Sequence, residues 1–144
     1  MLVIDDFATM ARIMKMLAER VGFRNVDMCH DGDTALRMMQ LQRYGYVICD
    51  IKMDPINGVE FAHLLRAEPY GKDCVILLTS ADVEAMAAAV NSGIETVVDG
   101  TIMKPFNSKD LRVKLREIAA QRSATKGKRQ FDPVPIPQKP RLHS

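Results

Sequence analysis

Polar groups that could bind a metal or a phosphate stand directly after four short apolar runs of this chain. The runs at 2–4, 46–49, 75–78 and 101–103 are followed by Asp5-Asp6, Asp50, Thr79 and Lys104. Apolar runs bounded by turn residues are typical of parallel strands that are covered on both faces. Because the carboxyl ends of such strands share one edge of the sheet, we expect three carboxylates, a hydroxyl and an ammonium in one crevice.

Three carboxylates in one crevice need a positive partner. Asp5, Asp6 and Asp50 would repel one another by several kcal/mol if water were partly excluded. A divalent cation relieves that repulsion, and oxygen ligands with open positions suit Mg²⁺. Taken alone, Asp5-Asp6 is equally typical of a turn or a helix cap, but the polar groups at the neighbouring strand ends favour a magnesium site.

Thr79 and Lys104 add a hydroxyl donor and an ammonium, which a cation does not need and phosphoryl oxygens do. Asp50 is then the candidate nucleophile, because a carboxylate can form an acyl phosphate. The alternative for Lys104-Pro105 is a surface lysine before a turn. A cis peptide bond before Pro105 would aim the lysine into the crevice.

Strand-like and helix-like segments alternate five times along the chain. A second, less apolar strand is expected at 26–29, and 94–100 is expected to be part loop and part lead-in to the fifth strand. Helices are expected from residue 7 to Gly22, from Asp31, over 59–67, around 83–90, and after an N-cap at Asn107. The alternation predicts an α/β protein with a doubly wound parallel five-stranded sheet.

Apolar spacing within each helix predicts the side chains that face the sheet. The expected inward residues are Ile13, Met16, Leu17 and Val21; Ala35, Leu36, Met38 and Met39; Phe61, Ala62 and Leu65; Val83, Met86, Ala87 and Val90; and Leu111, Leu115, Ile118 and Ala119.

Composition divides the chain at Ser123. Residues 1–122 hold 15 Lys and Arg against 17 Asp and Glu, whereas residues 123–144 hold 5 against 1. We predict one folded domain over 1–122, which is no obvious nucleic-acid binder, and a basic, Pro-rich, disordered tail over 123–144.

Membrane and redox signals are weak throughout. No apolar run is long enough for a membrane helix and no secretory signal precedes the first strand, so we expect a cytoplasmic protein. Cys29, Cys49 and Cys74 lie in or beside apolar runs without C-x-x-C spacing. They are therefore expected to be reduced, buried thiols rather than a disulfide or a zinc site.

The polar strand ends and their surroundings resemble the signature of the bacterial response-regulator receiver domain, in its single-domain, CheY-like form. The positions that carry the resemblance are Asp5-Asp6, Asp50 with Met53 and Gly58, Thr79, and Lys104-Pro105-Phe106. The resemblance covers residues 1 to about 120. It implies a flavodoxin-like fold with strand order 2-1-3-4-5.

The resemblance also implies a role for each position. Asp50 would accept a phosphoryl group from a histidine kinase or a phosphotransfer protein. Mg²⁺ would be held by Asp6, Asp50 and the backbone carbonyl of Lys52, with Asp5 acting largely through water. Thr79 and Lys104 would hold the phosphoryl oxygens.

The implied output is binding to a downstream protein target in a two-component phosphorelay, through the surface of the fourth helix, fifth strand and fifth helix. Only self-phosphotransfer and autodephosphorylation are expected as catalysis, and no DNA-binding domain or membrane role is expected. Lys52 and Ala81 would border the path of the hydrolytic water and tune dephosphorylation. A shift of Thr79 would remodel the face of the fourth helix.

Three features depart from the family pattern. Pro55 stands one place later than usual, although Gly58 keeps its distance from the acceptor, and Ser80 replaces the usual Ala. Thr101 occupies the place of the switch aromatic, in a segment from 93 to 104 that is longer than usual. Loop geometry around the site is assigned to Met53, Pro55, Gly58 and Pro105.

Several alternatives stay open at this point. The chain could be a receiver-like scaffold without phosphorylation, or a receiver cut from a larger regulator, and a homodimer through the output surface is compatible with either. A haloacid-dehalogenase-type phosphohydrolase also uses a strand-end Asp with Mg²⁺, but it needs Asp-x-Asp after the first strand. A flavodoxin relative would need a phosphate loop there.

Overall fold

Five parallel strands form the centre of the molecule in the computed structural model, which describes residues 1–125. The strands are β1 (Leu2–Ile4), β2 (Asp27–Cys29), β3 (Tyr46–Asp50), β4 (Val75–Ser80) and β5 (Gly100–Met103). Their order across the sheet is β2-β1-β3-β4-β5, which confirms the predicted flavodoxin-like α/β fold. Residues 126–144 lie outside the described part, so disorder of the basic tail stays a prediction.

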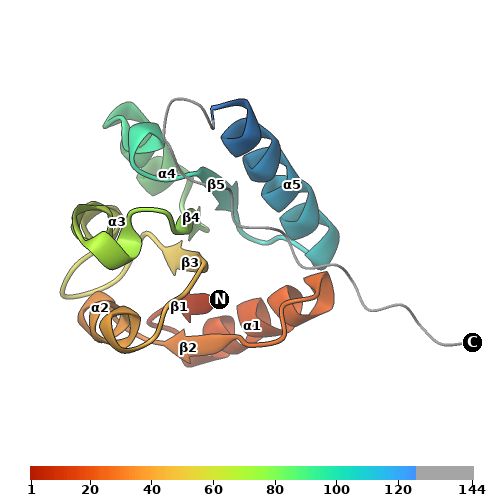
Figure 1. Ribbon diagram of the computed structural model, residues 1–144, viewed down its shortest axis with the longest axis horizontal. Helices are drawn as coiled ribbons and strands as arrows, with labels where there is room; N and C mark the ends of the chain where they lie inside the picture. Colours follow the sequence, from red (N-terminus) through yellow and green to blue (C-terminus); the bar gives the residue numbers. More distant parts are fainter. Residues whose placement is uncertain (126–144) are drawn as a thin grey trace, which may run out of the picture.

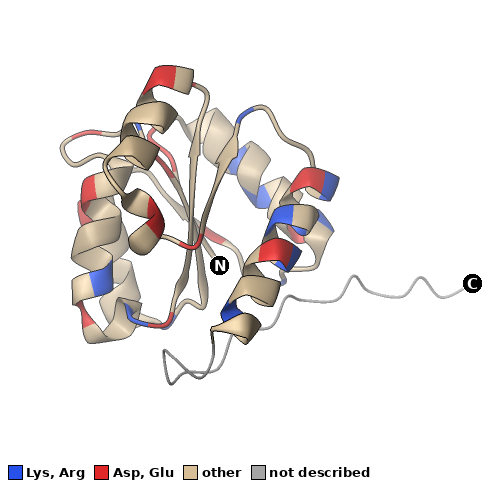
Figure 2. Ribbon diagram, turned by 90° about the horizontal axis from the view of Figure 1, so that it is seen from above, with Lys and Arg blue, Asp and Glu red and all other residues tan. Residues whose placement is uncertain are grey.

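Helices cover both faces of the sheet, as the two views in Figures 1 and 2 show. They are α1 (Ala8–Val21), α2 (Gly32–Leu41), α3 (Gly58–Ala67), α4 (Val83–Asn91) and α5 (Ser108–Ala124), with short 3₁₀ helices η1 (Pro69–Gly71) and η2 (Ile94–Thr96). Helices α1 and α5 lie on one face, and α2, α3 and α4 lie on the other (Figure 1). None of the helices within residues 1–125 is long and apolar enough to cross a bilayer.

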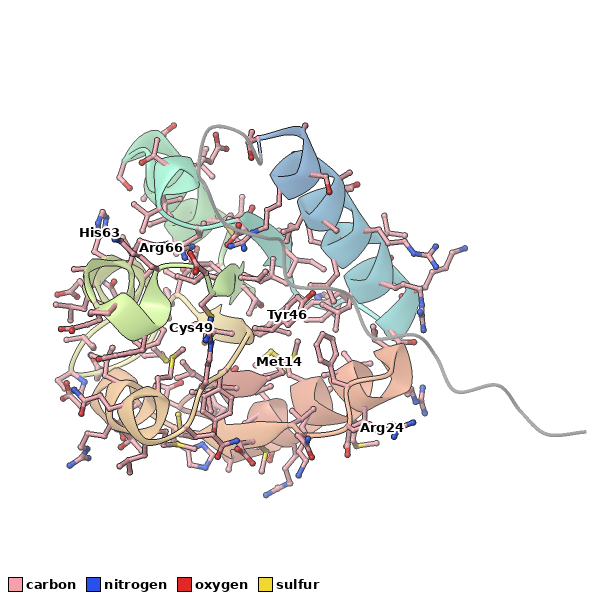
Figure 3. All side chains as sticks on the ribbon, viewed as in Figure 1. Met14, Arg24, Tyr46, Cys49, His63 and Arg66 are labelled. Carbon is pink, nitrogen blue, oxygen red and sulfur yellow. The ribbon has the colours of Figure 1, made fainter. Side chains whose placement is uncertain are left out.

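Alternation along the strands divides the buried side chains into two cores. Met14 and Tyr46 belong to the core beneath α1 and α5, whereas Cys49 belongs to the core beneath α2, α3 and α4 (Figure 3). The rings of Phe23 and Tyr46 meet edge to face, with centroids 4.9 Å apart. The three cysteines are free and buried, which confirms the expectation of buried thiols.

Side-chain caps set where the helices begin. Asn57 and Asn107 each form a capping box, with Glu60 and Asp110 respectively, so the predicted N-cap at Asn107 is confirmed. Gly22 ends α1 with a φ of 124°, a conformation that a side chain would disfavour. The predicted helix end at Gly22 is confirmed as well, because such boundaries depend on residues close together in the chain.

The inward faces of α1 and α4 differ from those predicted. Ile13 and Met16 are 44% and 56% exposed, while Met14 and Ala18 are buried against the sheet. Apolar residues surround most of α1, so their spacing alone does not select the stripe that contacts the sheet, which is formed by Ala11, Met14, Ala18 and Val21. In α4, Val83 and Val90 are likewise exposed, at 72% and 38%.

A buried ionic cluster fastens the amino ends of β4 and β5. Asp99 accepts hydrogen bonds from Arg122 Nε at 2.7 Å, from Arg66 Nη2 at 3.1 Å and from the backbone N–H of Ile76 at 2.9 Å. Arg66, labelled in Figure 3, extends from α3, and Arg122 extends from the last turns of α5. Arg122 is only 4% exposed, so α5 contacts the rest of the fold as far as this residue, and the helix continues to Ala124. The domain boundary at 122 stays a prediction.

Candidate functional site

The predicted site residues meet at the carboxyl edge of the sheet. Asp50 is the last residue of β3 and lies opposite Thr79 of β4 in the strand register, and Thr79 lies opposite Ile102 of β5. Asp5 directly follows β1, and Lys104 directly follows β5. The strand order therefore places acids from β1 and β3 beside a hydroxyl from β4 and a lysine from β5.

Lys104 is the positive centre of this edge. Its ammonium lies 2.8 Å from Asp5 Oδ2 and 3.5 Å from Asp50 Oδ1. The Lys104 side chain is 9% exposed and that of Asp5 is fully buried, so their attraction is little weakened by water. The alternative of a surface lysine is thereby excluded. The peptide bonds before Pro55 and Pro105 are both cis.

One ammonium does not balance the three acids. Asp5, Asp6 and Asp50 each offer a carboxylate oxygen within 4.8 Å of the others. Burial raises the pKa of the Asp50 carboxyl above its ordinary value; Lys104 lowers it, and Asp5 raises it further. Asp6 is exposed, which leaves one side of the acidic cluster open to solvent. The donor set therefore fits a hard divalent cation that keeps several waters.

Thr79 brings an uncommitted hydroxyl to the site. Its side chain is fully buried, and Oγ1 has no hydrogen-bond partner among residues 1–125. Such a group costs free energy unless a ligand or an ordered water completes it. A hydroxyl beside Asp50 with unused donor capacity matches the need of an added phosphoryl oxygen.

The loop after Asp50 is packed tightly against the site. A Cβ at Gly58 would lie 2.3 Å from the Asp50 carbonyl oxygen, so only glycine fits there without movement. The Gly58 N–H donates to the Ile51 carbonyl at 2.8 Å, and Met53 is buried. Lys52 lines a pocket of about 650 Å³ together with Asp50 and Lys104.

The position of Thr101 is compatible with the predicted switch site. It lies in β5 opposite Leu78 and is partly exposed. A polar pocket between β5 and α5 includes Thr101, Glu95 and Lys114. No aromatic side chain is among the residues that line this pocket.

A scan against protein-family models matches residues 1–116 to the response regulator receiver domain. This chain is a response-regulator receiver. The receiver is 34% identical over 117 residues to the chemotaxis protein CheY-3 of Vibrio cholerae, covering 81% of this chain and 88% of that protein. It is 32% identical to the chemotaxis protein CheY of Pseudomonas aeruginosa, covering 81% and 93%.

Solved structures give the same family. The receiver superposes with a TM-score of 0.70 on the response regulator TrrA from Thermotoga maritima, solved in complex with Mg²⁺ and BeF. The two are 27% identical, and the match covers 81% of this chain and 96% of the other. The fold, and membership among CheY-like receivers of two-component signalling, are thus shown.

Sequence reasoning missed one feature of the receiver's site. The Lys52 ammonium pairs with the carboxylate of Asp82, which caps α4 by accepting from the backbone N–H groups of Glu84 and Ala85. The cap itself was readable, since an Asp directly before an apolar helical stretch is a common N-cap. The pairing of Lys52 with Asp82 could not be predicted from the sequence, because it joins two loops that are separated along the chain.

Proposed function

We propose that this protein is a response regulator in which Asp50 accepts a phosphoryl group. The observation that carries the proposal is the position of Lys104, whose ammonium lies 3.5 Å from Asp50 Oδ1 and 2.8 Å from Asp5 Oδ2. A cation fixed at the nucleophile can neutralise charge on an incoming phosphoryl group. Thr79 supports the proposal, because its buried hydroxyl has no other partner within residues 1–125.

The chemistry is one displacement at phosphorus. An Asp50 carboxylate oxygen forms a P–O bond while the P–N bond of a phosphohistidine breaks, and the imidazole leaves with the electron pair of that bond. The product is an acyl phosphate on Asp50. Lys104 and the Thr79 hydroxyl would donate to the phosphoryl oxygens and orient them.

Mg²⁺ belongs to the same proposal. Asp5, Asp6 and Asp50 fit the ion by donor type and by mutual distance. We infer that Asp6, Asp50 and the backbone carbonyl of Lys52 would bind it directly, with Asp5 acting largely through water. When bound, the ion would neutralise charge shared by the acids and the phosphoryl oxygens. The complex of TrrA with Mg²⁺ and BeF supports this assignment by family relationship.

The partners follow from this role. The phosphoryl donor would be a histidine kinase or a phosphotransfer protein, and the output would be a protein target that binds the surface of α4, β5 and α5. The names of two relatives favour a chemotaxis-type pathway. A cytoplasmic location remains part of the proposal.

A second candidate is a receiver-like scaffold that is not phosphorylated. One observation favours this candidate. Thr101 of β5 replaces the aromatic residue whose side chain usually changes position on phosphorylation, so the usual change of the output surface cannot occur in the same way. The complete set of Asp5, Asp6, Asp50, Thr79 and Lys104 favours phosphorylation instead. A homodimer through α4, β5 and α5 is compatible with both candidates.

Mass spectrometry decides between the two candidates. Incubation of the protein with acetyl phosphate and Mg²⁺ should add one phosphoryl group to the intact protein, and the addition should vanish in Asp50→Asn. Acetyl phosphate supplies the group without a kinase, so the experiment does not depend on an unknown partner. Wild-type protein that stays unmodified while a known receiver is phosphorylated in parallel would support the scaffold.

A further inference from the structure

Lys52 and Asp82 form an ion pair, and both residues line the pocket that contains Asp50. Lys52 lies in the loop after β3, Asp82 lies between β4 and α4, and both side chains line the pocket of Asp50 and Lys104. Lys52 is 64% exposed and Asp82 is 33% exposed, so the pair sits at the border with solvent. Because Lys52 lines the same pocket as Asp50 and Lys104, its ammonium is a second cation available to an anion added to Asp50.

Asp82 connects this pair to the start of α4. One carboxylate oxygen, Oδ1, accepts from the N–H groups of Glu84 at 2.9 Å and Ala85 at 3.1 Å, while Oδ2 faces Lys52. The N–H of Asp82 itself donates to Ser80 Oγ at 3.0 Å. A change at Oδ2 is therefore felt by the cap of α4, because both oxygens belong to one rigid carboxylate.

Each partner stabilises the charged form of the other. Lys52 lowers the pKa of the Asp82 carboxyl, with the backbone N–H groups of the cap adding to the effect, and Asp82 raises the pKa of Lys52. The pair is nevertheless weak, because exposed ion pairs are screened by water and contribute little. Lys52 can therefore exchange Asp82 for a stronger anionic partner at little cost in free energy.

We propose that Asp82 is a positioning residue that holds the Lys52 ammonium at this pocket, and that a phosphoryl group on Asp50 competes with Asp82 for this ammonium. The proposal rests on the proposed function, since it needs an anion on Asp50. A phosphoryl group brings nearly two negative charges and strong acceptor oxygens, whereas Asp82 offers one charge. Withdrawal of Lys52 frees Oδ2 of Asp82 and changes the cap of α4.

This competition gives the receiver a route from Asp50 to α4 that does not use residue 101. Thr101 stands where the family usually has an aromatic residue. It lies in β5, which follows α4 along the chain. The Lys52–Asp82 route passes instead through the loops after β3 and β4. Both loops border the pocket directly, so no side-chain rotation within β5 is needed.

A double-mutant cycle with the phosphoryl analogue beryllofluoride and Mg²⁺ tests the competition. Asp82→Asn keeps an oxygen that can cap α4 and removes the charge that holds Lys52. We expect Asp82→Asn to tighten beryllofluoride binding about two- to fivefold, in line with a weak exposed pair. In a Lys52→Gln background the same substitution should have little effect.

The amide resonances of Glu84 and Ala85 give a second readout. They should shift when beryllofluoride binds the wild type, and the shift should shrink in Lys52→Gln and return in Lys52→Arg. In protein without added ions, Lys52→Gln and Asp82→Asn should both move these resonances. Amide spectra that match the wild type elsewhere establish that the variants are folded.

Two failures are distinguishable. If beryllofluoride binds with Mg²⁺ but Asp82→Asn tightens it equally with and without Lys52, the charge of Asp82 acts directly and the competition is refuted. An unchanged Ala85 shift in Lys52→Gln refutes the relay to α4. Absence of any binding to the wild type, together with absence of phosphorylation by acetyl phosphate, overturns the proposed function and this inference with it.

Discussion

Lys104 Nζ lies 2.8 Å from Asp5 Oδ2, although 99 residues separate the two along the chain. The contact joins the ends of β1 and β5, two strands with β3 and β4 between them in the sheet. Asp5 is fully buried, and a buried carboxylate without a partner is very costly. Lys104 therefore has a structural role in addition to the one proposed at the phosphoryl group.

Replacement of the lysine tests that structural role. Lys104→Met should lower the free energy of unfolding by about 3 kcal/mol, because it leaves buried acids without their cation. Urea unfolding without divalent ions measures the change. Lys109→Met, at an exposed position on α5, is the matched control and should change stability by less than about 0.5 kcal/mol. Equal effects of the two substitutions would contradict the role of Lys104.

The raised pKa of Asp50 predicts a pH-dependent penalty. Burial raises its folded-state pKa, so the native state binds a proton more readily than the unfolded state does. Stability from this group therefore falls as pH rises from the ordinary carboxyl pKa through the folded value. Asp50→Asn should be more stable than wild type at pH 7, and the difference should shrink towards pH 3.

Unfolding curves of both proteins across this pH range, without divalent ions, measure the effect. Asp33→Asn is a suitable control, since Asp33 is exposed in the first turn of α2. A stability difference between wild type and Asp50→Asn that grows as pH falls would have the wrong sign.

The hydroxyl of Thr79 should cost stability and serve phosphorylation. Thr79→Val keeps the shape of the side chain and removes a buried Oγ1 that lacks a partner within the described chain. We expect a gain of about 1 kcal/mol in the free energy of unfolding, because an unsatisfied buried group is removed. Phosphorylation of the same variant by acetyl phosphate should slow.

Thr79→Ser keeps the hydroxyl and serves as the control, with phosphorylation closer to wild type. Thermal or urea unfolding and mass spectrometry measure the two properties on one sample. A Thr79→Val variant that is both destabilised and fully phosphorylated would show that the hydroxyl is satisfied and unused.

The ionic cluster of Asp99, Arg66 and Arg122 lies at the amino edge of the sheet, opposite the site. It should contribute to the stability of the fold and not to phosphorylation. Arg122→Met should cost about 3 kcal/mol, because it removes a buried partner of Asp99 and the donor to the backbone carbonyl of Asp73. The Cys74 carbonyl loses one of its two donors and keeps Arg66 Nη1. Arg116 is exposed on α5, so Arg116→Met is the control. Once the variant is folded at low temperature, its phosphorylation rate should equal that of wild type; a selective loss of phosphorylation would link the cluster to the site.

The sequence predicted the site better than it predicted the packing around it. Asp50, Thr79 and Lys104 each follow an apolar run, and parallel strands necessarily bring such positions to one edge. The prediction of the inward face of α1 was wrong because Ile13, Met14 and Met16 are all apolar. Only their contact with the sheet decides which of them is buried. The roles of the site residues remain proposals.

The ionic contacts could not be predicted for a different reason. Arg66, Asp99 and Arg122 look like ordinary surface charges in the sequence, and their burial depends on how α3 and α5 are placed over β4 and β5. The pairing of Lys52 with Asp82 likewise depends on the relative position of two loops. Neither set of contacts can be recognised from residues that are neighbours in the sequence.

The cluster around Asp99 has one more consequence for β5. Asp99 stands directly before the strand and Lys104 directly after it, so ion pairs hold the start of β5 and the proposed phosphoryl-binding lysine follows its end. The strand cannot slide along β4 by a residue without pulling Asp99 away from both arginines. The backbone N–H of Lys104 also donates to the Ser80 carbonyl at 2.9 Å. We therefore expect any displacement of the Lys104 ammonium to come from rotation of its side chain, while the hydrogen-bond ladder of the sheet stays in place.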